Sequence, residues 1–258
     1  MSLTLNAWQV SPYSAKVRAY LRAKKIPFRE RVPSFWTLSR PIARAVGKAV
    51  MPTVVTETGE WLQDSSEIID QLEGRYSDPP IVPETPVQAL ASHLLELHGD
   101  EWLPTVIMHT RWNTPENSSF AINEFARDGF PWLPLFVSRP LAGKVAQRMQ
   151  SYRSRLGITE NTAPGIEGFG RSLIAHLEAH LATHAFVLGG RPTLGDFSLY
   201  GPLWAHVYRD PGSRSWFDDA PQVVGWMERM HDASAHMTGT LLGNDDVPET
   251  LDPIFRTL

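Results

Sequence analysis

The sequence predicts an α/β domain at the N-terminus followed by an all-helical second domain. Up to about residue 76, short β-branched stretches alternate with amphipathic helical stretches. The paired prolines of Ser-Asp-Pro-Pro (77–80) then stop the chain from continuing as a helix. Beyond them, apolar residues recur mostly at helical spacing. We therefore expect a first domain over residues 1–76, a linker over 77–86, and a helical domain over 87–258.

Composition limits the classes of function. The chain has 258 residues, of which 42% are apolar and 20% charged, as in an ordinary globular protein of one large or two modest domains. A formal net charge of −4 gives no support for a nucleic-acid partner. The absence of cysteine excludes disulfides, thiolate metal sites and cysteine nucleophiles.

The start of the chain, MSLTLNAWQ, lacks the basic and apolar segments of a signal peptide. No run approaches the 18 apolar residues that a membrane span needs. A cytoplasmic protein without a membrane span is the expectation.

The first domain is expected to run strand, helix, strand, strand, strand, helix. The stretches with these patterns are residues 3–8, 13–25, 28–32, 53–56, 61–62 and 65–72. Residues 35–50 show no clear pattern. In the second domain, helical spacing covers residues 84–112 with a kink at Pro104, then 141–156, 168–184, 194–208 and 222–235.

Residues 113–140 fit neither pattern, yet they hold five large aromatic side chains among prolines and polar residues. A disordered segment would not carry so many aromatics. We expect an ordered excursion, either a lid on the helical core or a wall of a substrate pocket.

Ser11 stands where the first helix begins, with Pro12 at the first helical position. The simplest interpretation is a helix cap. The alternative is an anion site, because a helix N-terminus stabilises an anion by about 0.3–1 kcal/mol. A hydroxyl that donates to a charged acceptor adds about 1.5–3 kcal/mol. Together these lower the pKa of a bound thiol by about 1–3 units.

A second stretch, residues 49–72, carries features suited to an extended peptide. Met51-Pro52 precedes a β-branched strand, which fits a cis peptide bond in a turn that leaves the Met51 backbone free to pair. Asp64 and Ser65 open the next helix, where backbone N–H groups suit a carboxylate and Asp64 suits an ammonium group. Two anion sites with a peptide-binding edge between them suit a small thiol peptide.

These motifs resemble those of the soluble glutathione transferases, of the serine type. Ser11-Pro-Tyr-Ser14, Met51-Pro52 and Asp64-Ser65 resemble the family's serine entry, cis-proline and γ-glutamyl site, and GGRPTLGDFSLYGPLW (189–204) resembles the Thr-x-x-Asp helix start of its second domain. The resemblance covers nearly the whole chain. It implies a thioredoxin-like N-terminal domain with a mixed four-stranded sheet, an all-α C-terminal domain and a homodimer. Three differences are Asp64, where the family often has Glu or Gln, the segment 35–50, which shows little of the family's pattern, and the longer segment 113–140.

The resemblance also implies roles for individual residues. Ser11 would bind the glutathione sulfur, with Ser14 as the second candidate. The main chain of Met51, next to the cis-proline Pro52 of the glutathione site, would pair with the cysteinyl part. Asp64 and Ser65 would hold the γ-glutamyl end, and Lys48 would reach the glycyl carboxylate. His109 and Trp112, on a helix that faces the sulfur in this family, are candidates for the acceptor pocket, although aromatics at helical spacing are usually core.

Two further patterns favour structural roles. Thr193 and Asp196 have the spacing of a capping box, which indicates folding stability rather than catalysis. His176, His180 and His184 lie in one row of a helix. Their sequence does not match a His-Glu-x-x-His metal motif, so we expect a polar helix face and no metal.

The leading hypothesis is an enzyme of detoxification type that adds the glutathione thiolate, held by Ser11, to a small electrophilic or hydrophobic substrate. Glutathione-dependent isomerisation or dehalogenation would use the same parts. Reactions that need an enzyme cysteine are not expected, since the chain has none. The alternatives are a non-catalytic glutathione- or ligand-binding module and a protein-interaction adaptor on the same fold.

Overall fold

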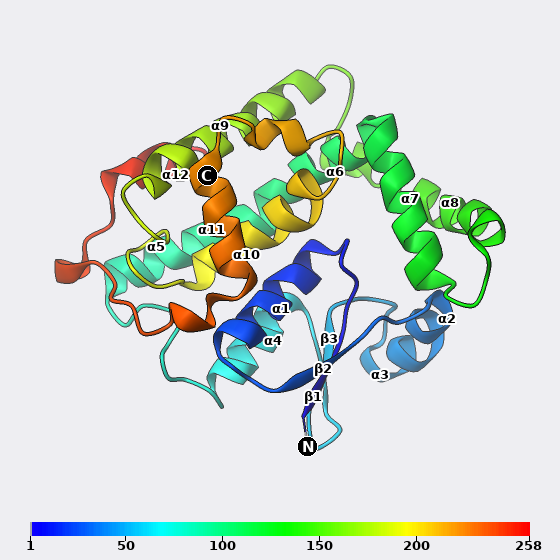
Figure 1. Ribbon diagram of the computed structural model, residues 1–258, viewed down its shortest axis with the longest axis horizontal. Helices are drawn as coiled ribbons and strands as arrows, with labels where there is room; N and C mark the ends of the chain where they lie inside the picture. The colour runs from blue at the N-terminus through cyan, green and yellow to red at the C-terminus, as the bar shows by residue number, and fades with distance from the viewer. Residues whose placement is uncertain (1) are drawn as a thin grey trace.

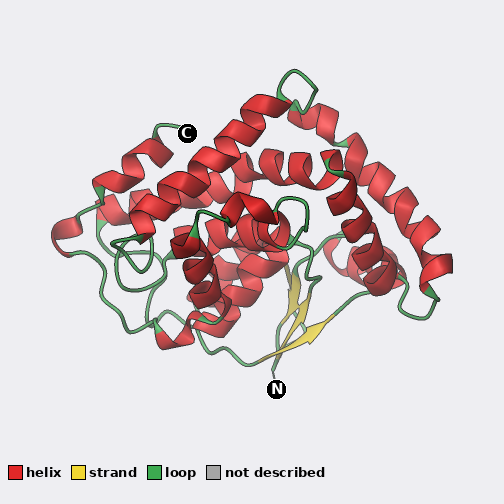
Figure 2. Cartoon of the chain, turned by 45° about the horizontal axis from the view of Figure 1, so that its top comes forward, coloured by secondary structure: helices red, strands yellow, loops and turns green. Residues whose placement is uncertain are grey.

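The computed structural model describes residues 2–258 and has an α/β part followed by a larger helical part (Figure 1). Figure 2 shows the strands at one edge of the molecule, with helices making up most of the rest. Of the helices within residues 2–258, none combines the length and the apolar character needed to cross a bilayer.

The sheet has four strands in the order β2-β1-β3-β4. They are β1 (Leu3–Asn6), β2 (Phe28–Arg31), β3 (Thr53–Val55) and β4 (Trp61–Gln63). β1 is parallel to β2 and antiparallel to β3, and β3 is antiparallel to β4. The register pairs Leu5 with Val54 and Val54 with Leu62, so three buried apolar side chains line up across one face. The predicted mixed sheet and helical second part are confirmed.

Two helices of the first part, α1 (Pro12–Ala23) and α4 (Ser65–Glu73), pack beside each other against the sheet (Figure 1). The stretch 35–46, which the sequence left unassigned, is helical. It forms α2 (Phe35–Thr37), a π-helical turn (Leu38–Ile42) and α3 (Ala43–Val46). Its Leu38 and Ile42 are buried in an apolar cluster. This tertiary packing stabilises short helices that the local sequence pattern alone does not predict.

After the linker, the chain is helical. The α-helices are α5 (Pro86–Leu97), α6 (Leu103–Asn113), α7 (Pro115–Gly129), α8 (Leu135–Ser151), α9 (Ala163–Leu181), α10 (Leu194–Pro202), α11 (Pro221–His231) and α12 (Asp252–Phe255). π-Helical turns join α5 to α6 (His98–Trp102) and extend α10 (Leu203–Tyr208). The irregularity expected at Pro104 is thus a π-turn that ends at Trp102, two residues before the proline.

The segment 113–140 is an ordered helical hairpin rather than an irregular excursion. It contains α7 and the start of α8, and α8 begins six residues before the expected start at residue 141. The two helices pack side by side and α7 reaches α2 (Figure 1). Gly129, at the end of α7, permits this contact, because a Cβ there would lie 2.1 Å from the Phe35 ring.

The molecule has two apolar cores. The larger one fills the space between the sheet, α1, α4 and the central helices α5, α6, α9, α10 and α11. The smaller one is centred on Trp8, Trp112 and Phe125, and it joins the loop before α1 to α6, α7 and α8. We call it the second core. It places apolar side chains next to the start of α1.

The expected capping box is present at the start of α10, with Thr193 and Asp196 fully buried. The prediction that His176, His180 and His184 form a polar helix face is wrong at His180. That side chain is buried, bonds Thr250 Oγ1 through Nδ1 at 2.7 Å and stacks on His184. Burial, together with the neighbouring His184, lowers the pKa of His180 to about 4, so its ring is neutral.

Candidate functional site

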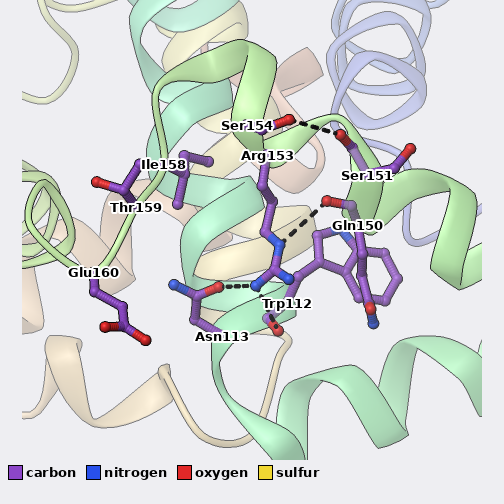
Figure 3. Close-up of a pocket in the computed structure, with 9 residues that line it drawn as sticks. All are labelled: Trp112, Asn113, Gln150, Ser151, Arg153, Ser154, Ile158, Thr159 and Glu160. Atoms are coloured by element: carbon purple, nitrogen blue, oxygen red, sulfur yellow. Dashed lines mark hydrogen bonds between the residues drawn. The ribbon is translucent and has the colours of Figure 1, made fainter.

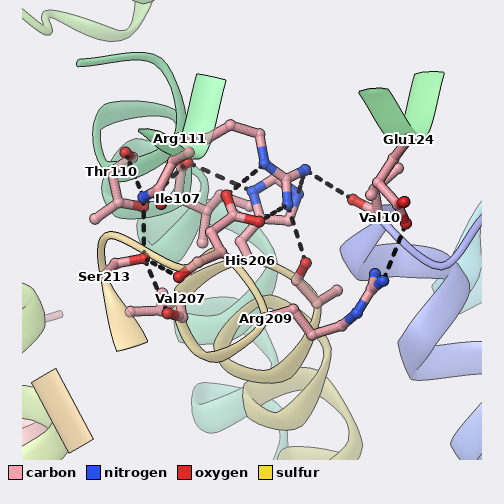
Figure 4. Close-up of polar contacts among 12 residues, drawn as sticks. Val10, Ile107, Thr110, Arg111, Glu124, His206, Val207, Arg209 and Ser213 are labelled. Carbon is pink, nitrogen blue, oxygen red and sulfur yellow. Dashed lines mark hydrogen bonds and ion pairs between the residues drawn. The ribbon is translucent and has the colours of Figure 1, made fainter. Parts of the chain in front are cut away.

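The loop that leads into α1 is held in place by a buried arginine of α6. Arg111 donates from Nη1 to the Val10 carbonyl at 2.9 Å, directly before Ser11 (Figure 4). Its Nε and Nη2 form a bidentate pair with the buried Asp210 at 2.7 and 2.6 Å. The remaining N–H groups reach Ala205 O at 3.0 Å and His206 Nε2 at 2.7 Å. All five donors of the guanidinium therefore have acceptors, which fixes the backbone of the loop.

His206 acts as an acceptor in this cluster because it is uncharged. Burial and the neighbouring Arg111 guanidinium hold the pKa of His206 well below its usual value. Its Nδ1 lies 3.4 Å from the Ile107 carbonyl, so the Nδ1–H tautomer leaves Nε2 free to accept from Arg111.

Ser11 is the N-cap of α1, with extended backbone angles, and Pro12 follows it. Its Oγ accepts from the Ser14 N–H at 3.2 Å. The side chain is half-buried, and its hydroxyl proton is not used in this contact. Since the first turn of a helix also leaves the Tyr13 N–H without a helical acceptor, two donors face the same end of α1.

The other hydroxyls near this helix start are less available. Ser14 is fully buried, and its Oγ has no partner within residues 2–258. The Tyr13 hydroxyl donates to the Asp100 carbonyl at 3.2 Å. Burial, helped by the Asp100 carboxylate, raises the pKa of Tyr13, so this phenol stays protonated.

A helix of the second part lies unusually close to the first turn of α1. A Cβ on Gly201 of α10 would lie 2.6 Å from the Pro12 carbonyl oxygen, so only glycine permits this approach. The start of α1 is thus fixed from two sides, by Gly201 on α10 and by Arg111 on α6.

Met51-Pro52 is a cis peptide bond, as expected from its position before β3. Pro52 is buried, and the Met51 side chain packs against the second core. β3 pairs with β1 and β4 through residues 53–55, and Met51 precedes that ladder. The Met51 backbone therefore lies at the end of the sheet.

Asp64 caps α4 in a conformation that non-glycine residues rarely adopt, with φ 73° and ψ 130°. Its exposed side chain accepts from the Ser66 N–H at 3.1 Å. Ser65 is buried at the first helical position. The first turn of α4 leaves backbone N–H groups without helical acceptors, and such groups suit a carboxylate.

A charged cluster lies between α1, α4 and α5. The buried Lys16 ammonium contacts Glu96 at 2.9 Å, Asp100 at 2.6 Å and Ser66 Oγ at 3.1 Å. Burial raises the pKa of Asp100, against the pull of Lys16. With both carboxylates ionised, the cluster carries a net charge of −1 beside the start of α4, which favours a cationic group nearby.

The candidates Lys48 and His109 lie in different environments. Lys48 is exposed in the loop that follows α3. His109 is buried, with Nε2 2.9 Å from Glu167 Oε1 and Nδ1 2.8 Å from the Asn113 amide. Both ring nitrogens of His109 are thus occupied by the protein.

Trp112 lies between the second core and a cavity of about 640 Å³ (Figure 3). The cavity is walled by the end of α6, the end of α8 and the turn that follows. Arg153 points into this region and bonds Asn113 Oδ1 and the Gln150 carbonyl. His109 does not line the cavity, but its partner Asn113 does. Trp112 therefore connects the loop before Ser11 with an open, largely polar hollow.

No group of three His, Cys, Asp or Glu side chains within residues 2–258 is arranged to hold a metal ion. The starts of α1 and α4 offer backbone N–H donors, with Ser11 as the cap of α1 and Asp64 as the cap of α4.

Two family models match the chain. One, described as the N-terminal domain of glutathione S-transferase, matches residues 5–80, and one described as its C-terminal domain matches residues 170–229. Together they span more than half of the 258 residues. The chain belongs to the glutathione transferase family.

Solved structures share the fold over nearly the whole length. A beta-etherase from a Sphingobium species has 17% identity and a TM-score of 0.66, covering 92% of this chain and 98% of its own. A glutathione S-transferase from Methylobacterium radiotolerans, in complex with glutathione sulfonate, has 20% identity and a TM-score of 0.56, with 96% and 100% coverage. One from Methylobacillus flagellatus, with glutathione bound, has 15% identity and a TM-score of 0.53, with 90% and 98% coverage. A search of curated proteins gave no match.

Sequence reasoning did not identify Arg111 or the carboxylates that surround Lys16. Arg111 meets Asp210 across 99 positions of the chain, and nothing in the local sequence marks either partner. Lys16 follows the Ser11-Pro-Tyr-Ser14 motif by two residues, but its partners Glu96 and Asp100 lie 80 and 84 positions away. The signal available in the sequence was a lysine between Ala15 and Val17, within an otherwise largely apolar helix.

Proposed function

We propose that this protein is a serine-type glutathione transferase. It binds reduced glutathione at the start of α1, stabilises the thiolate with the Ser11 hydroxyl and adds the sulfur to a small electrophilic or hydrophobic substrate. The observation that carries the proposal is the half-buried Ser11 cap, whose oxygen accepts from Ser14 while its proton is left for a ligand. Glutathione bound to one solved structure of the same fold, and glutathione sulfonate bound to another, support the choice of ligand.

Ser11 is favoured over Ser14 because of burial. Ser14 is fully buried on the inner side of α1, whereas Ser11 is half-buried at its open end. A thiolate at this end would accept from the Ser11 hydroxyl and the Tyr13 N–H, in the partial positive field of the helix. These interactions favour the ionised sulfur and activate it as a nucleophile at neutral pH.

The rest of the tripeptide fits the sites already described. The cysteinyl backbone would pair with Met51, next to the cis bond to Pro52. The γ-glutamyl carboxylate would accept from the first N–H groups of α4 at Ser65, while Asp64 and the negative cluster beside Ser66 attract its ammonium group. Lys48, in the exposed loop after α3, is the cation available for the glycyl carboxylate.

The acceptor would approach from the side of the second core. Trp112 supplies an apolar wall next to the start of α1 and lines the cavity of about 640 Å³. His109 supports this wall through Asn113 rather than contacting the acceptor. Conjugation is the default reaction. Because a solved structure of the same fold is a beta-etherase, ether cleavage is a second reaction to test. We also propose a cytoplasmic homodimer.

The experiment combines glutathione titration by calorimetry with an electrophile panel for wild type, Ser11→Ala, Ser14→Ala and Ser34→Ala. Ser34 is the matched control, since it caps α2 with the same 3.2 Å bond to a backbone N–H. We expect turnover to fall 10- to 100-fold in Ser11→Ala alone.

Three other outcomes contradict parts of the proposal. Glutathione binding without any turnover would support a non-catalytic binding module. No binding would support an adaptor on the same fold. Loss of turnover in Ser14→Ala with normal activity in Ser11→Ala would move the sulfur contact to Ser14.

A further inference from the structure

The tip of the α7–α8 hairpin carries an exposed apolar patch. Trp132, in the connection, is 62% exposed, and Phe136, in the first turn of α8, is 80% exposed. Val137, Pro140 and Leu141 follow on the outer side of the same helix and are also exposed. We call these five residues the hairpin patch. Monomeric proteins rarely leave large aromatic side chains this open without a partner.

The outer face of α8 continues from the hairpin patch into cations. Lys144 lies two turns after Phe136, and Arg148 lies one turn after Lys144, on the face opposite the buried Ser138, Ala142 and Ala146. Lys144 and Arg148 form no ion pair with any residue in the range 2–258. The outer face is thus apolar at one end and basic at the other.

The segment of the chain that contains α8 carries positive charges and no negative ones. Residues 129–159 contain five Lys or Arg and no Asp or Glu, in a chain whose formal net charge is −4. In Figure 1, α7 and α8 form one edge of the molecule, away from both termini. The outer face of α8 therefore offers apolar and basic side chains at one edge of a chain that is acidic as a whole.

We propose that the outer face of α8 docks on an anionic lipid bilayer. Trp132, Phe136 and Leu141 enter the interface between headgroups and acyl chains, and Lys144 and Arg148 contact the lipid phosphates. Aromatic and aliphatic side chains insert into the headgroup region of such a bilayer, and nearby Lys or Arg side chains add electrostatic attraction to anionic lipids. A second copy of this chain fits less well, because two such faces would bring unpaired cations together.

Vesicle co-sedimentation tests the proposal with the full-length protein. We expect binding to vesicles of equal parts phosphatidylglycerol and phosphatidylcholine, and at least tenfold weaker binding to phosphatidylcholine alone. Lys144→Glu/Arg148→Glu should lower the partition coefficient at least tenfold, and Trp132→Ser/Phe136→Ser at least fivefold. Raising the salt from 0.1 to 0.5 M should weaken wild-type binding, since surface charges are screened.

Two double variants serve as controls. Arg29→Glu/Arg256→Glu changes the net charge by the same amount at exposed positions of β2 and the C-terminal segment. Val87→Ser/Leu90→Ser removes two exposed apolar side chains of α5. Both should bind anionic vesicles like wild type.

Equal losses in the controls, or binding that ignores lipid charge, would overturn the proposal. So would a shift from dimer to monomer in sedimentation velocity for Trp132→Ser/Phe136→Ser, which would assign the hairpin patch to contact between copies. Thermal unfolding of every variant shows whether each remains folded. The glutathione assays are independent of this result, since no residue of the outer face is placed in the proposed site.

Discussion

Two helix N-termini in this protein carry similar cap residues but differ in how many of their polar atoms have partners. At the start of α10, Asp196 is fully buried and accepts from Thr193 N, Thr193 Oγ1, Val187 N and Trp226 Nε1 at 2.8–3.0 Å. At the start of α1, Ser11 is half-buried and accepts from Ser14 N alone. The first terminus is closed, with its polar atoms satisfied. The second is open, with a hydroxyl proton and a backbone N–H left over.

The difference shows how one kind of cap serves stability or binding. A fully satisfied cap adds to the free energy of folding and offers nothing to a ligand. An open cap is tolerated because Arg111 and Gly201 fix the backbone around it from the second part. The central claim is that folding free energy resides at the closed terminus and chemistry at the open one.

The largest expected effect is that of Asp196→Ala at the closed terminus. Several buried donors would lose their acceptor, and each orphaned donor costs about 1–3 kcal/mol, so we expect a loss of about 3–6 kcal/mol in the free energy of unfolding. Urea denaturation measures it. A protein that is fully stable yet inactive would contradict the comparison.

Arg111→Met comes next, because it leaves the Asp210 carboxylate buried and unpaired. Removal of one partner of a buried pair costs about 3–5 kcal/mol. Arg111→Met/Asp210→Leu should recover much of that stability in urea denaturation but not glutathione affinity, since the Val10 carbonyl still lacks its donor. Full recovery of affinity in the double variant would show that Arg111 does not position the start of α1.

Two buried titratable groups near the closed terminus, His180 and Asp196, should make the free energy of unfolding depend on pH. The pKa of His180 is lowered to about 4 in the folded protein, against about 6.5 unfolded, so its stabilising contribution is complete above pH 6.5 and is lost as the pH falls toward 4. Asp196, with a pKa raised to about 6, acts in the opposite direction, so wild type alone would hide the effect.

A comparison with His180→Asn isolates the histidine. Between pH 6.5 and 4, the unfolding free energy of wild type should fall by about 2–3 kcal/mol relative to the variant. Urea denaturation at four pH values measures the gap. A gap that does not change with pH would mean that His180 is not held neutral by burial.

The sequence predicted those features of the structure that depend on residues close together in the chain. The Thr193–Asp196 box and the Ser11-Pro12 cap are local signals, and both lie where expected. α7 was missed, although Pro115 at its first turn and the spacing of Ala121 and Phe125 fit a helix, because the aromatic and proline residues obscured the period. Arg111 and Asp210 gave no signal at all, since their pairing exists only in the folded chain.

The smallest expected effect on stability is that of Ser11→Ala. Loss of a serine cap costs about 0.5–2 kcal/mol, and Ser34→Ala should cost a similar amount. Thermal unfolding of both variants compares the two caps. A much larger cost at Ser11 would mean that it belongs with the closed terminus as a structural residue.

The ionisation of bound glutathione tests the central claim most directly. Ultraviolet absorbance of the thiolate, followed against pH in the saturated complex, gives the pKa of the bound thiol. We expect a value about 1–3 units below the ordinary 8.5 in wild type and Ser34→Ala, and a value near 8.5 in Ser11→Ala. A wild-type complex whose thiol remains protonated at neutral pH would contradict the account.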